Sequence, residues 1–339
     1  MSSQAPNIHQ LLEEVEEASK NLPPDVFQDD AARKRLQEAA ARLSGALESP
    51  IDGVRRLIFQ VGPQTYTPTP VTTALTVPSM ADYVRHFAYE ALPIYADLPQ
   101  YMEKHGYKVP NNPAHAPFCE KFGSIQWEYF KDHPERGQSF NTFMQGQHQG
   151  RTCWLDFYPA EERLFAEVAK EDSAVLLVDV GGGRGHDLLE LANRKGTGHG
   201  RLILQDLPEV VADAPELNVV ESMGYDFFTP QPVKGAKAYY FRRIFHDWDT
   251  ESCQKILRNQ LPAMEKGYSK LVFNDILVPE TNAPFFVAGM DVAMMITLAG
   301  MERTRTQWSE LLESEGLQLV DVWQAKGGVE AVIEAVLKD

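Results

Sequence analysis

One histidine of the chain stands in a setting that suits proton transfer. His246 follows an apolar segment over residues 236–241 and precedes Asp247 and Trp248. An unperturbed imidazole has a pKa of about 6.5, so its neutral form can accept a proton near neutral pH and act as a general base. Taken alone, a histidine at a strand end is more often structural, and we interpret Asp247 and Trp248 as structural. The surroundings of His246 therefore decide its function.

A cluster of glycines follows the most strand-like segment of the chain. Residues 176–180 are apolar apart from Asp179, and Gly181, Gly183 and Gly185 lead from them into a helix-like segment. A buried strand, a tight turn and a helix N-terminus form the ligand crevice of a doubly wound α/β sheet, where glycines let the backbone approach a ligand. The spacing is tighter than the G-x-G-x-x-G of dinucleotide sites. By itself it could mark no more than a turn that connects a strand to a helix.

Acidic residues end the segments that follow. Asp206 closes the next expected strand, where an α/β nucleotide site places an acid that accepts both ribose hydroxyls. It could equally cap the helix that begins at Pro208, and the two roles are compatible. Asp226 lies in the next loop and could accept a hydrogen bond from an adenine amino group, with Phe227 against the purine face.

In this order, the motifs resemble those of class I S-adenosylmethionine-dependent O-methyltransferases of the small-molecule, caffeate-type family, in the form found in fungal secondary metabolism. So many ordered motifs make chance agreement negligible. The similarity covers roughly residues 150–339 and rests on residues 178–183 (VDVGGG), 205–210 (QDLPEV), 225–228 (YDFF), 239–248 (YYFRRIFHDW), 274–279 (NDILVP) and 301–304 (MERT).

The resemblance implies a role for each matching residue. His246 would remove the proton of a phenol or enol while the methyl group moves from sulfonium to oxygen, with Glu302 and Asp275 flanking the imidazole. Asp275 stands where the family more often has glutamate, so its side chain is short for the orienting hydrogen bond. The implied cofactor-binding residues are Asp179 and Gly181 at the methionine part of S-adenosylmethionine, Gly183 in the same turn, Asp206 at the ribose, Asp226 and Phe227 at the adenine, and Arg242 in place of a family lysine.

The acceptor is expected to be a small hydrophobic molecule of polyketide, phenolic or pyridone type. Residues 118–158 are rich in aromatic side chains, and methionines recur in an expected helix over residues 286–299. Such residues fill cores at least as often as they line ligand pockets. The candidate acceptor-binding residues are Met144, His148, Trp154, Met290, Met294 and His86.

Two other functions remain open. Some fungal members of this fold bind S-adenosylmethionine yet catalyse dehydration and pericyclic ring closure without methyl transfer, with help from a histidine in the N-terminal half. His86 lies in roughly the corresponding region, whereas the intact His246-Asp247-Trp248 favours methyl transfer. The third possibility is a catalytically silent partner subunit.

The elements that must position these residues form an α/β fold. We expect strands over residues 176–180, 202–207, 236–241 and 270–278, alternating with helices, and a closing hairpin of strands 317–323 and 329–336. This pattern indicates a Rossmann-like, doubly wound, mostly parallel sheet with an antiparallel C-terminal hairpin. It would form an S-adenosylmethionine-binding catalytic domain over residues 111–339.

Residues 1–110 are expected to form a mainly helical dimerisation and cap domain. Helices are expected over residues 8–20, 30–47, 80–95 and 98–105, with an extended proline-rich segment around Tyr66 and Thr67. Most of the family's winged helix would be missing, because residues 42–60 run almost directly into that extended segment. Amphipathic helices outside a closed domain need a partner surface, so we expect a homodimer.

Composition excludes several kinds of partner. The net charge of −16 argues against nucleic acid or an anionic membrane surface. No apolar run approaches the ~20 residues of a membrane span, and the N-terminus is unlike a secretory signal. Three cysteines without Cys-x-x-Cys spacing fit reduced thiols and a cytoplasmic location. No cluster has metal-ligand spacing, so no metal is expected.

Overall fold

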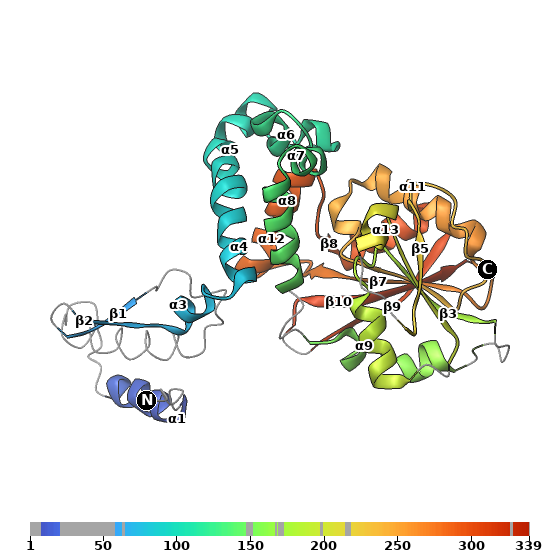
Figure 1. Ribbon diagram of the computed structural model, residues 1–339, viewed down its shortest axis with the longest axis horizontal. Coiled ribbons are helices and arrows are strands. Elements are labelled where there is room, and N and C mark those ends of the chain that lie inside the picture. Colours follow the sequence, from blue (N-terminus) through green and yellow to red (C-terminus); the bar gives the residue numbers. More distant parts are fainter. Residues whose placement is uncertain are drawn as a thin grey trace. The chain divides into compact units, whose positions relative to one another are not determined.

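A computed structural model describes residues 8–20, 58–62, 65–146, 152–166, 168, 173–196, 199–213, 218–325 and 328–338. The described residues divide into two compact units (Figure 1). The first contains those up to Arg85 together with Ser139–Gly146, and the second contains His86–Gln138 and those after residue 146. The domain boundary expected between residues 110 and 111 stays a prediction.

The first unit contains short helices and a two-stranded sheet. Strands β1 (Ile58–Gly62) and β2 (Thr65–Pro68) pair antiparallel, which confirms the extended conformation expected around Tyr66. Its described helices are α1 (Ile8–Ser19), α3 (Pro70–Ala74), most of α4 (Pro78–His86) and the end of α8 (Pro134–Gly146). The expected helix over residues 30–47 lies outside the described residues.

The helical part of the second unit packs around α12 (Phe285–Leu298). Ile94, Phe118 and Ile296 are almost fully buried there and join three helices in one apolar cluster. Where two separate helices were expected over residues 80–95 and 98–105, the chain forms a π-helical turn at Phe87–Ala91 and then α5 (Leu92–Lys104) without interruption. The other helices here are α6 (Pro117–Phe122), α7 (Gln126–Asp132) and the start of α8.

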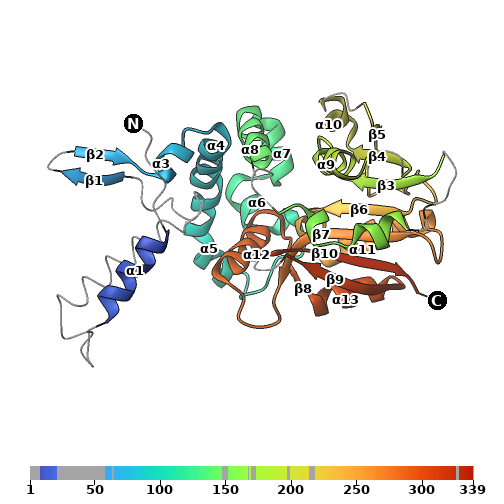
Figure 2. The same cartoon turned by 90° about the horizontal axis from the view of Figure 1, so that it is seen from below.

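The rest of the second unit is built on a twisted sheet with the strand order β5-β4-β3-β6-β7-β10-β9 (Figure 2). Strands β3 to β7 run parallel, β10 is antiparallel to both β7 and β9, and the two-residue strand β8 (Arg303–Thr304) pairs with β7. The mostly parallel sheet with an antiparallel hairpin is therefore confirmed. The strands are β3 (Val175–Val180), β4 (Arg201–Asp206), β5 (Glu221–Gly224), β6 (Ala238–Arg242), β7 (Lys270–Val278), β9 (Leu317–Gln324) and β10 (Glu330–Leu337).

Helices cover both faces of this sheet because alternate strand residues point to opposite sides. On one face, Tyr239 and Phe273 pack against α11 (Thr250–Gln260) and α13 (Arg305–Ser314). On the other face, Tyr240 and Val272 belong to a separate cluster that includes α9 (His186–Lys195). Figure 1 shows α9 on one side of the sheet and α11 and α13 on the other. The short helix α10 (Pro208–Asp213) follows β4.

A buried polar network joins the segment before β3 to the amino end of the central strands. Glu334 of β10 is fully buried and accepts a hydrogen bond of 2.6 Å from the Tyr158 hydroxyl. Arg163 donates to both of its carboxylate oxygens, and Lys270 Nζ lies 3.2 Å from Oε1. Although burial opposes ionisation, these donors lower the pKa of Glu334. The charge is thus fully compensated inside the protein.

Candidate active site

The turn between β3 and α9 is built from glycines with left-handed backbone. Gly181 has a φ of 74° and Gly183 a φ of 58°. A Cβ on Gly181 would lie 2.5 Å from Cδ1 of Ile244, so the side chain of Ile244 would have to move, and the left-handed φ itself disfavours any residue but glycine. A Cβ on Gly183 would have no described atom within 4 Å, apart from those of Gly183 and its two chain neighbours. The backbone of Gly183 therefore borders open space. The turn lies at the carboxyl end of β3, between β4 and β6, where open α/β sheets bind ligands.

Asp206 lies beside this turn at the end of β4. Its Oδ2 accepts a hydrogen bond of 2.8 Å from the backbone N–H of Gly183, and its Oδ1 accepts one of 2.7 Å from Leu207. Burial raises the pKa of Asp206, although the two backbone bonds oppose this shift. Each carboxylate oxygen keeps a second lone pair, so Asp206 can accept further hydrogen bonds from a ligand.

Asp179 is a buried acid without a hydrogen-bond partner in the described structure. It is 1% exposed, and neither of its carboxylate oxygens receives a hydrogen bond. Burial, followed by the charge of Asp187, raises the pKa of Asp179 well above its usual value. Leaving such a group unsatisfied is costly, so the geometry favours a ligand that brings a cation or an N–H donor.

The loop after β5 contributes an aromatic wall. Cε1 of Phe227 lies 3.8 Å from where a Cβ on Gly181 would be, so this ring reaches the glycine turn. Its centroid is 6.0 Å from that of Trp248 in an edge-on arrangement. Asp226 is exposed, and its Oδ1 accepts a hydrogen bond of 2.9 Å from the N–H of Phe228.

Arg242 ends β6 between two acids. Its Nη1 donates to both carboxylate oxygens of Asp187, at 2.9 and 3.0 Å, and its Nη2 lies 3.6 Å from Glu330. The guanidinium charge also opposes the rise in the pKa of Asp179. The charge of Arg242 is thus near enough to act on Asp179, the unpartnered acid of the crevice.

His246 lies among three carboxylates. It is carried by a 3-10 turn, Phe245–Asp247, and is 7% exposed. Its Nδ1 is 2.8 Å from Oε1 of Glu302, and its Nε2 is 3.4 Å from Oδ1 of Asp247. Glu302 therefore assigns the ring proton to Nδ1 and leaves Nε2 as the proton-accepting atom. Asp275 makes no hydrogen bond to the ring in the described structure, and its Oδ1 is buried without a partner.

The protonation state of His246 differs from the expectation of a neutral imidazole near neutral pH. Burial favours the neutral ring, yet the charges of Asp247 and Glu302 outweigh it and raise the pKa of His246 to about 9. Burial also raises the pKa of Asp247 and of Asp275 to about 6 each. In the free protein at neutral pH the imidazole is therefore protonated, because its carboxylate neighbours stabilise the cation.

Three of the expected acceptor-binding residues belong to the core, to the first unit or to the part of the chain outside the description. Trp154 is 1% exposed, and its ring stacks on Tyr240 at a centroid distance of 4.8 Å. Trp154 is thus packed in the core of the described structure, and its contact with an acceptor stays a prediction. Met144 lies on α8 in the first unit, and His148 lies outside the described residues.

The other expected acceptor-binding residues are half-buried. Met290 and Met294 lie on α12. His86 ends α4, and its Nδ1 lies 3.3 Å from Oε2 of Glu90, an almost fully buried acid in the π-helical turn.

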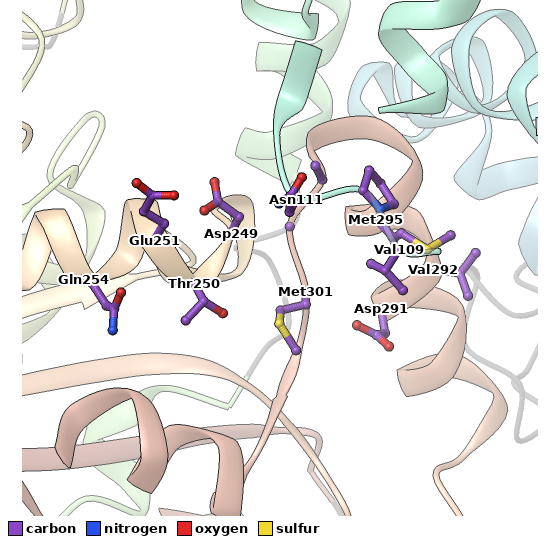
Figure 3. Close-up of a pocket in the computed structure, with 13 residues that line it drawn as sticks. Val109, Asn111, Asp249, Thr250, Glu251, Gln254, Asp291, Val292, Met295 and Met301 are labelled. Carbon is purple, nitrogen blue, oxygen red and sulfur yellow. The ribbon is translucent and has the colours of Figure 1, made fainter. Parts of the chain in front are cut away.

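A cavity of about 520 Å³ lies between α11, α12 and the segment before Glu302 (Figure 3). Asp249 on the α11 side and Asp291 with Met295 on the α12 side line it, and Met301 lies between them. Oδ1 of Asp291 accepts a hydrogen bond of 2.9 Å from the backbone N–H of Glu302. The cavity wall is thus connected to the acid that orients His246. Met290 and Met294 do not line this cavity.

Gly300→Ala should lower both stability and turnover. A Cβ at Gly300 would lie 2.0 Å from the backbone oxygen of His246 and 2.9 Å from the carbonyl carbon of Asp247, and backbone atoms cannot give way cheaply. We expect a loss of about 1–3 kcal/mol in unfolding free energy and a fall of roughly 10²-fold in kcat. Denaturant unfolding and steady-state kinetics measure the two effects.

Gly289→Ala is the matched control, since a Cβ at this position of α12 meets no described atom within 4 Å. It should be neutral or slightly stabilising. Equal stability and turnover in both variants and the wild type would show that the turn of His246 does not depend on Gly300.

Sequence reasoning missed three residues around His246. Asp247 was interpreted as structural, yet it lies 3.4 Å from the imidazole. Asp291 and Arg303 were not singled out. Asp291 accepts a hydrogen bond from the backbone N–H of Glu302, and Arg303 is buried, with 2% of its surface exposed. The available signal was adjacency in the sequence, since Asp247 follows His246 and Arg303 follows Glu302.

Comparison with known proteins gives consistent matches. The profile of the O-methyltransferase domain family matches residues 104–318. The O-methyltransferase mfmE of Annulohypoxylon moriforme is 38% identical over 274 residues, which is 80% of this chain and 68% of that protein.

Two solved structures cover almost the whole chain. The structure of LepI in complex with SAM is 29% identical with a TM-score of 0.77, and covers 98% of this chain and 84% of LepI. OxaC in complex with sinefungin and meleagrin is 25% identical with a TM-score of 0.75, and covers 99% of this chain and 100% of OxaC.

Proposed function

Because this chain belongs to the O-methyltransferase domain family, we propose that it transfers the methyl group of S-adenosylmethionine to a hydroxyl of a hydrophobic aromatic or polyketide-type secondary metabolite, with His246 as the general base. It is an enzyme of the methyltransferase class and uses S-adenosylmethionine. The observation that carries the assignment of the base is the Nδ1 contact of His246 with Glu302, which leaves Nε2 to accept a proton.

The crevice fits the cofactor. The unpartnered carboxylate of Asp179 suits the ammonium of the methionine part, and Asp206 keeps lone pairs for the ribose hydroxyls. Phe227 offers an apolar face for the adenine, and the open space at Gly183 admits a ligand against the backbone. When bound, S-adenosylmethionine supplies an electrophilic methyl group on a sulfonium.

His246 performs the proton transfer in this proposal. Its Nε2 takes the proton of the acceptor hydroxyl as the oxygen becomes nucleophilic, and Glu302 holds the ring through Nδ1 and stabilises the imidazolium that forms. Asp247 also faces Nε2, so the acceptor hydroxyl must enter beside this carboxylate.

The rate should depend on pH through His246. Nε2 can accept a proton only after the imidazole has lost its own, and the pKa of His246 in the free protein is about 9. We therefore expect kcat/KM to rise with pH and to level off only above about 9, measured from pH 6 to 10. Asp247→Asn removes a charge that raises this pKa and should move the rise to lower pH. A rise centred near 6.5 in the wild type, unmoved in Asp247→Asn, would contradict this account.

Methyl-labelled S-adenosylmethionine tests the function directly. Incubation of the protein with the labelled cofactor and an extract of host metabolites should give a labelled product by mass spectrometry. The control is the same reaction with His246→Ala.

A pericyclase is the second candidate, favoured by the similarity to a solved structure described as a pericyclic reaction enzyme, which is 29% identical with a TM-score of 0.78. The contact of the half-buried His86 with the buried Glu90 also favours it. It predicts cofactor-dependent ring closure with no methyl group gained, and loss of that reaction in His86→Ala. If no label enters any product while the demethylated cofactor still supports a rearrangement, the methyltransferase proposal is wrong.

A homodimer is part of the same proposal. We expect contacts through residues 8–47, of which those after residue 20 lie outside the described part, and through the helix from Met80. Phe87, Tyr89 and Leu92, which continue that helix, are exposed apolar residues. Sedimentation at micromolar concentration with the cofactor present should give twice the mass of 38.1 kDa. A single species at the monomer mass contradicts it.

The cytoplasmic location also remains a proposal. It is supported by Cys119, Cys153 and Cys253, which are all free thiols. In the part of the chain that the structure describes, no helix is long and apolar enough to cross a membrane. Fractionation of the producing cells tests the location.

A further inference from the structure

Arg303 is a buried arginine that binds the backbone on both sides of His246. It is 2% exposed, its Nη1 donates a hydrogen bond of 2.7 Å to the carbonyl of Phe245, and its Nη2 donates one of 3.0 Å to the carbonyl of Trp248. These carbonyls flank the turn that carries the imidazole. One rigid guanidinium therefore spans the whole turn, as only a forked donor can.

The thiol of Cys253 supports the same two carbonyls. Its Sγ lies 3.4 Å from the oxygen of Phe245 and 3.5 Å from that of Trp248, and Nη2 of Arg303 lies 3.3 Å from the sulfur. Cys253 is fully buried, and burial raises its pKa to about 12. The group therefore remains a neutral thiol that can donate to the carbonyls.

The guanidinium of Arg303 is compensated by hydrogen bonds to backbone carbonyls. Among the described residues no carboxylate forms an ion pair with it, although its charge opposes the rise in the pKa of Asp275 and of Asp291. Its further contacts are the carbonyl of Met301, 3.5 Å from Nη1, and the face of Trp308, 5.7 Å from Cζ to the ring centroid. A buried charge is costly unless it is hydrogen-bonded. Here the two shorter of these bonds go to the carbonyls of Phe245 and Trp248.

The residue before Arg303 binds the side chain of the same histidine. Glu302 contacts Nδ1 of His246, and Met301 donates its backbone N–H to the carbonyl of His246 at 3.0 Å. Residues 301–303 thus hold the imidazole, its own carbonyl and the two flanking carbonyls. A small rotation of the turn would break the contact with Glu302.

We propose that Arg303 and Cys253 are positioning residues that fix the turn of His246 so that its imidazole meets Glu302 and presents Nε2 to the acceptor. This inference rests on the proposed function for its kinetic part, because the base is needed only if a hydroxyl proton is removed. The position of the imidazole itself can be measured without any reaction.

Kinetics of conservative variants test the first part. Arg303→Lys keeps the charge but not the fork, so we expect kcat to fall roughly 10–100-fold while the Kd of S-adenosylmethionine changes less than twofold. Cys253→Ala should lose severalfold in kcat, and Cys253→Ser, which restores a donor, should recover most of it. Arg305→Lys is the matched control, since Arg305 is an exposed arginine 3.6 Å from Asp321 and should behave as the wild type.

A histidine-selective NMR titration tests the second part without turnover. The protein has nine histidines, and the His246 signal is assigned by its loss in His246→Gln. Arg303→Met removes a neighbouring cation, which alone would raise the pKa of His246. Displacement of the imidazole would instead lower this pKa, because the ring would lose its contact with Glu302. We therefore expect the pKa of His246 in Arg303→Met to fall from about 9 toward the ordinary value of about 6.5.

The outcomes separate the alternatives. Folded Arg303→Lys and Cys253→Ala with wild-type kcat and an unchanged or higher imidazole pKa in Arg303→Met overturn the inference. If the arginine variants do not fold, the Cys253→Ala and Cys253→Ser pair decides by kcat and by the imidazole titration. If the wild type transfers no methyl group, the proposed function fails, and the titrations still decide whether Arg303 and Cys253 position the ring.

Discussion

His246→Ala is expected to lower turnover by roughly 10²–10⁴-fold, which is the usual contribution of a general base. The imidazole lies among Glu302, Asp247 and Asp275 and not in the glycine turn, so affinity for S-adenosylmethionine should be unchanged. Steady-state kinetics and calorimetric titration with the cofactor measure the two quantities. Loss of cofactor binding together with turnover would show that His246 supports the crevice instead.

Glu302→Gln is the comparison for this variant. An amide keeps the length of the side chain and can still accept a hydrogen bond from Nδ1, but it does not stabilise the imidazolium. The loss in kcat should therefore be smaller than in His246→Ala. The pKa of the remaining imidazole should also fall, because the charge of Glu302 helps to raise it.

Asp206→Ala is expected to weaken binding of S-adenosylmethionine by about 2–4 kcal/mol, the loss of two charge-assisted hydrogen bonds to the ribose. The substitution also removes the acceptor of the Gly183 and Leu207 N–H groups, so the glycine turn loses a support. Calorimetry gives the change in Kd. Glu209→Ala, three residues away on an exposed position of α10, removes the same charge nearby and should leave the Kd unchanged.

Asp206→Asn separates the two contributions. The amide can still accept one backbone hydrogen bond but carries no charge, so it should bind the cofactor better than the alanine variant and worse than the wild type. Unchanged affinity in the alanine variant would remove Asp206 from the cofactor site.

Much of the second unit could be predicted from its sequence because its strands are continuous apolar runs with glycines or acids at their ends. Residues 176–180 and 270–278 match β3 and β7 to within a residue. Strand β5 was missed, since it has four residues and is mostly exposed. Helices α6 and α7 were missed as well, because six or seven residues carry too little periodicity to separate a helix from an aromatic-rich loop.

Only those residues of the candidate site that belong to sequence motifs could be predicted. The sequence placed His246, Glu302 and Asp206 in named roles, and the structure gives each of them a defined partner. The raised pKa of His246 was not predictable, because it depends on how closely the neighbouring Asp247 and two carboxylates from distant segments, Glu302 and Asp275, approach one ring. Adjacency to Glu302 could have drawn attention to Arg303, but its contacts with the carbonyls of Phe245 and Trp248 depend on the fold and are not visible in a single sequence.

Stabilising contacts and the candidate site lie at opposite ends of the parallel strands. The stabilising contacts are those of the buried polar network of Glu334, Arg163, Tyr158 and Lys270. This network lies at the amino end of the parallel strands, whereas the glycine turn, Asp206 and Arg242 lie at their carboxyl end. Substitutions far apart and without shared partners act additively. In laboratory evolution, the residues at the two ends of the strands can therefore be varied in separate libraries. One library, at the amino end, would be selected for thermal stability, and the other, at the carboxyl end, for activity on new acceptors. The best substitutions from both can then be combined.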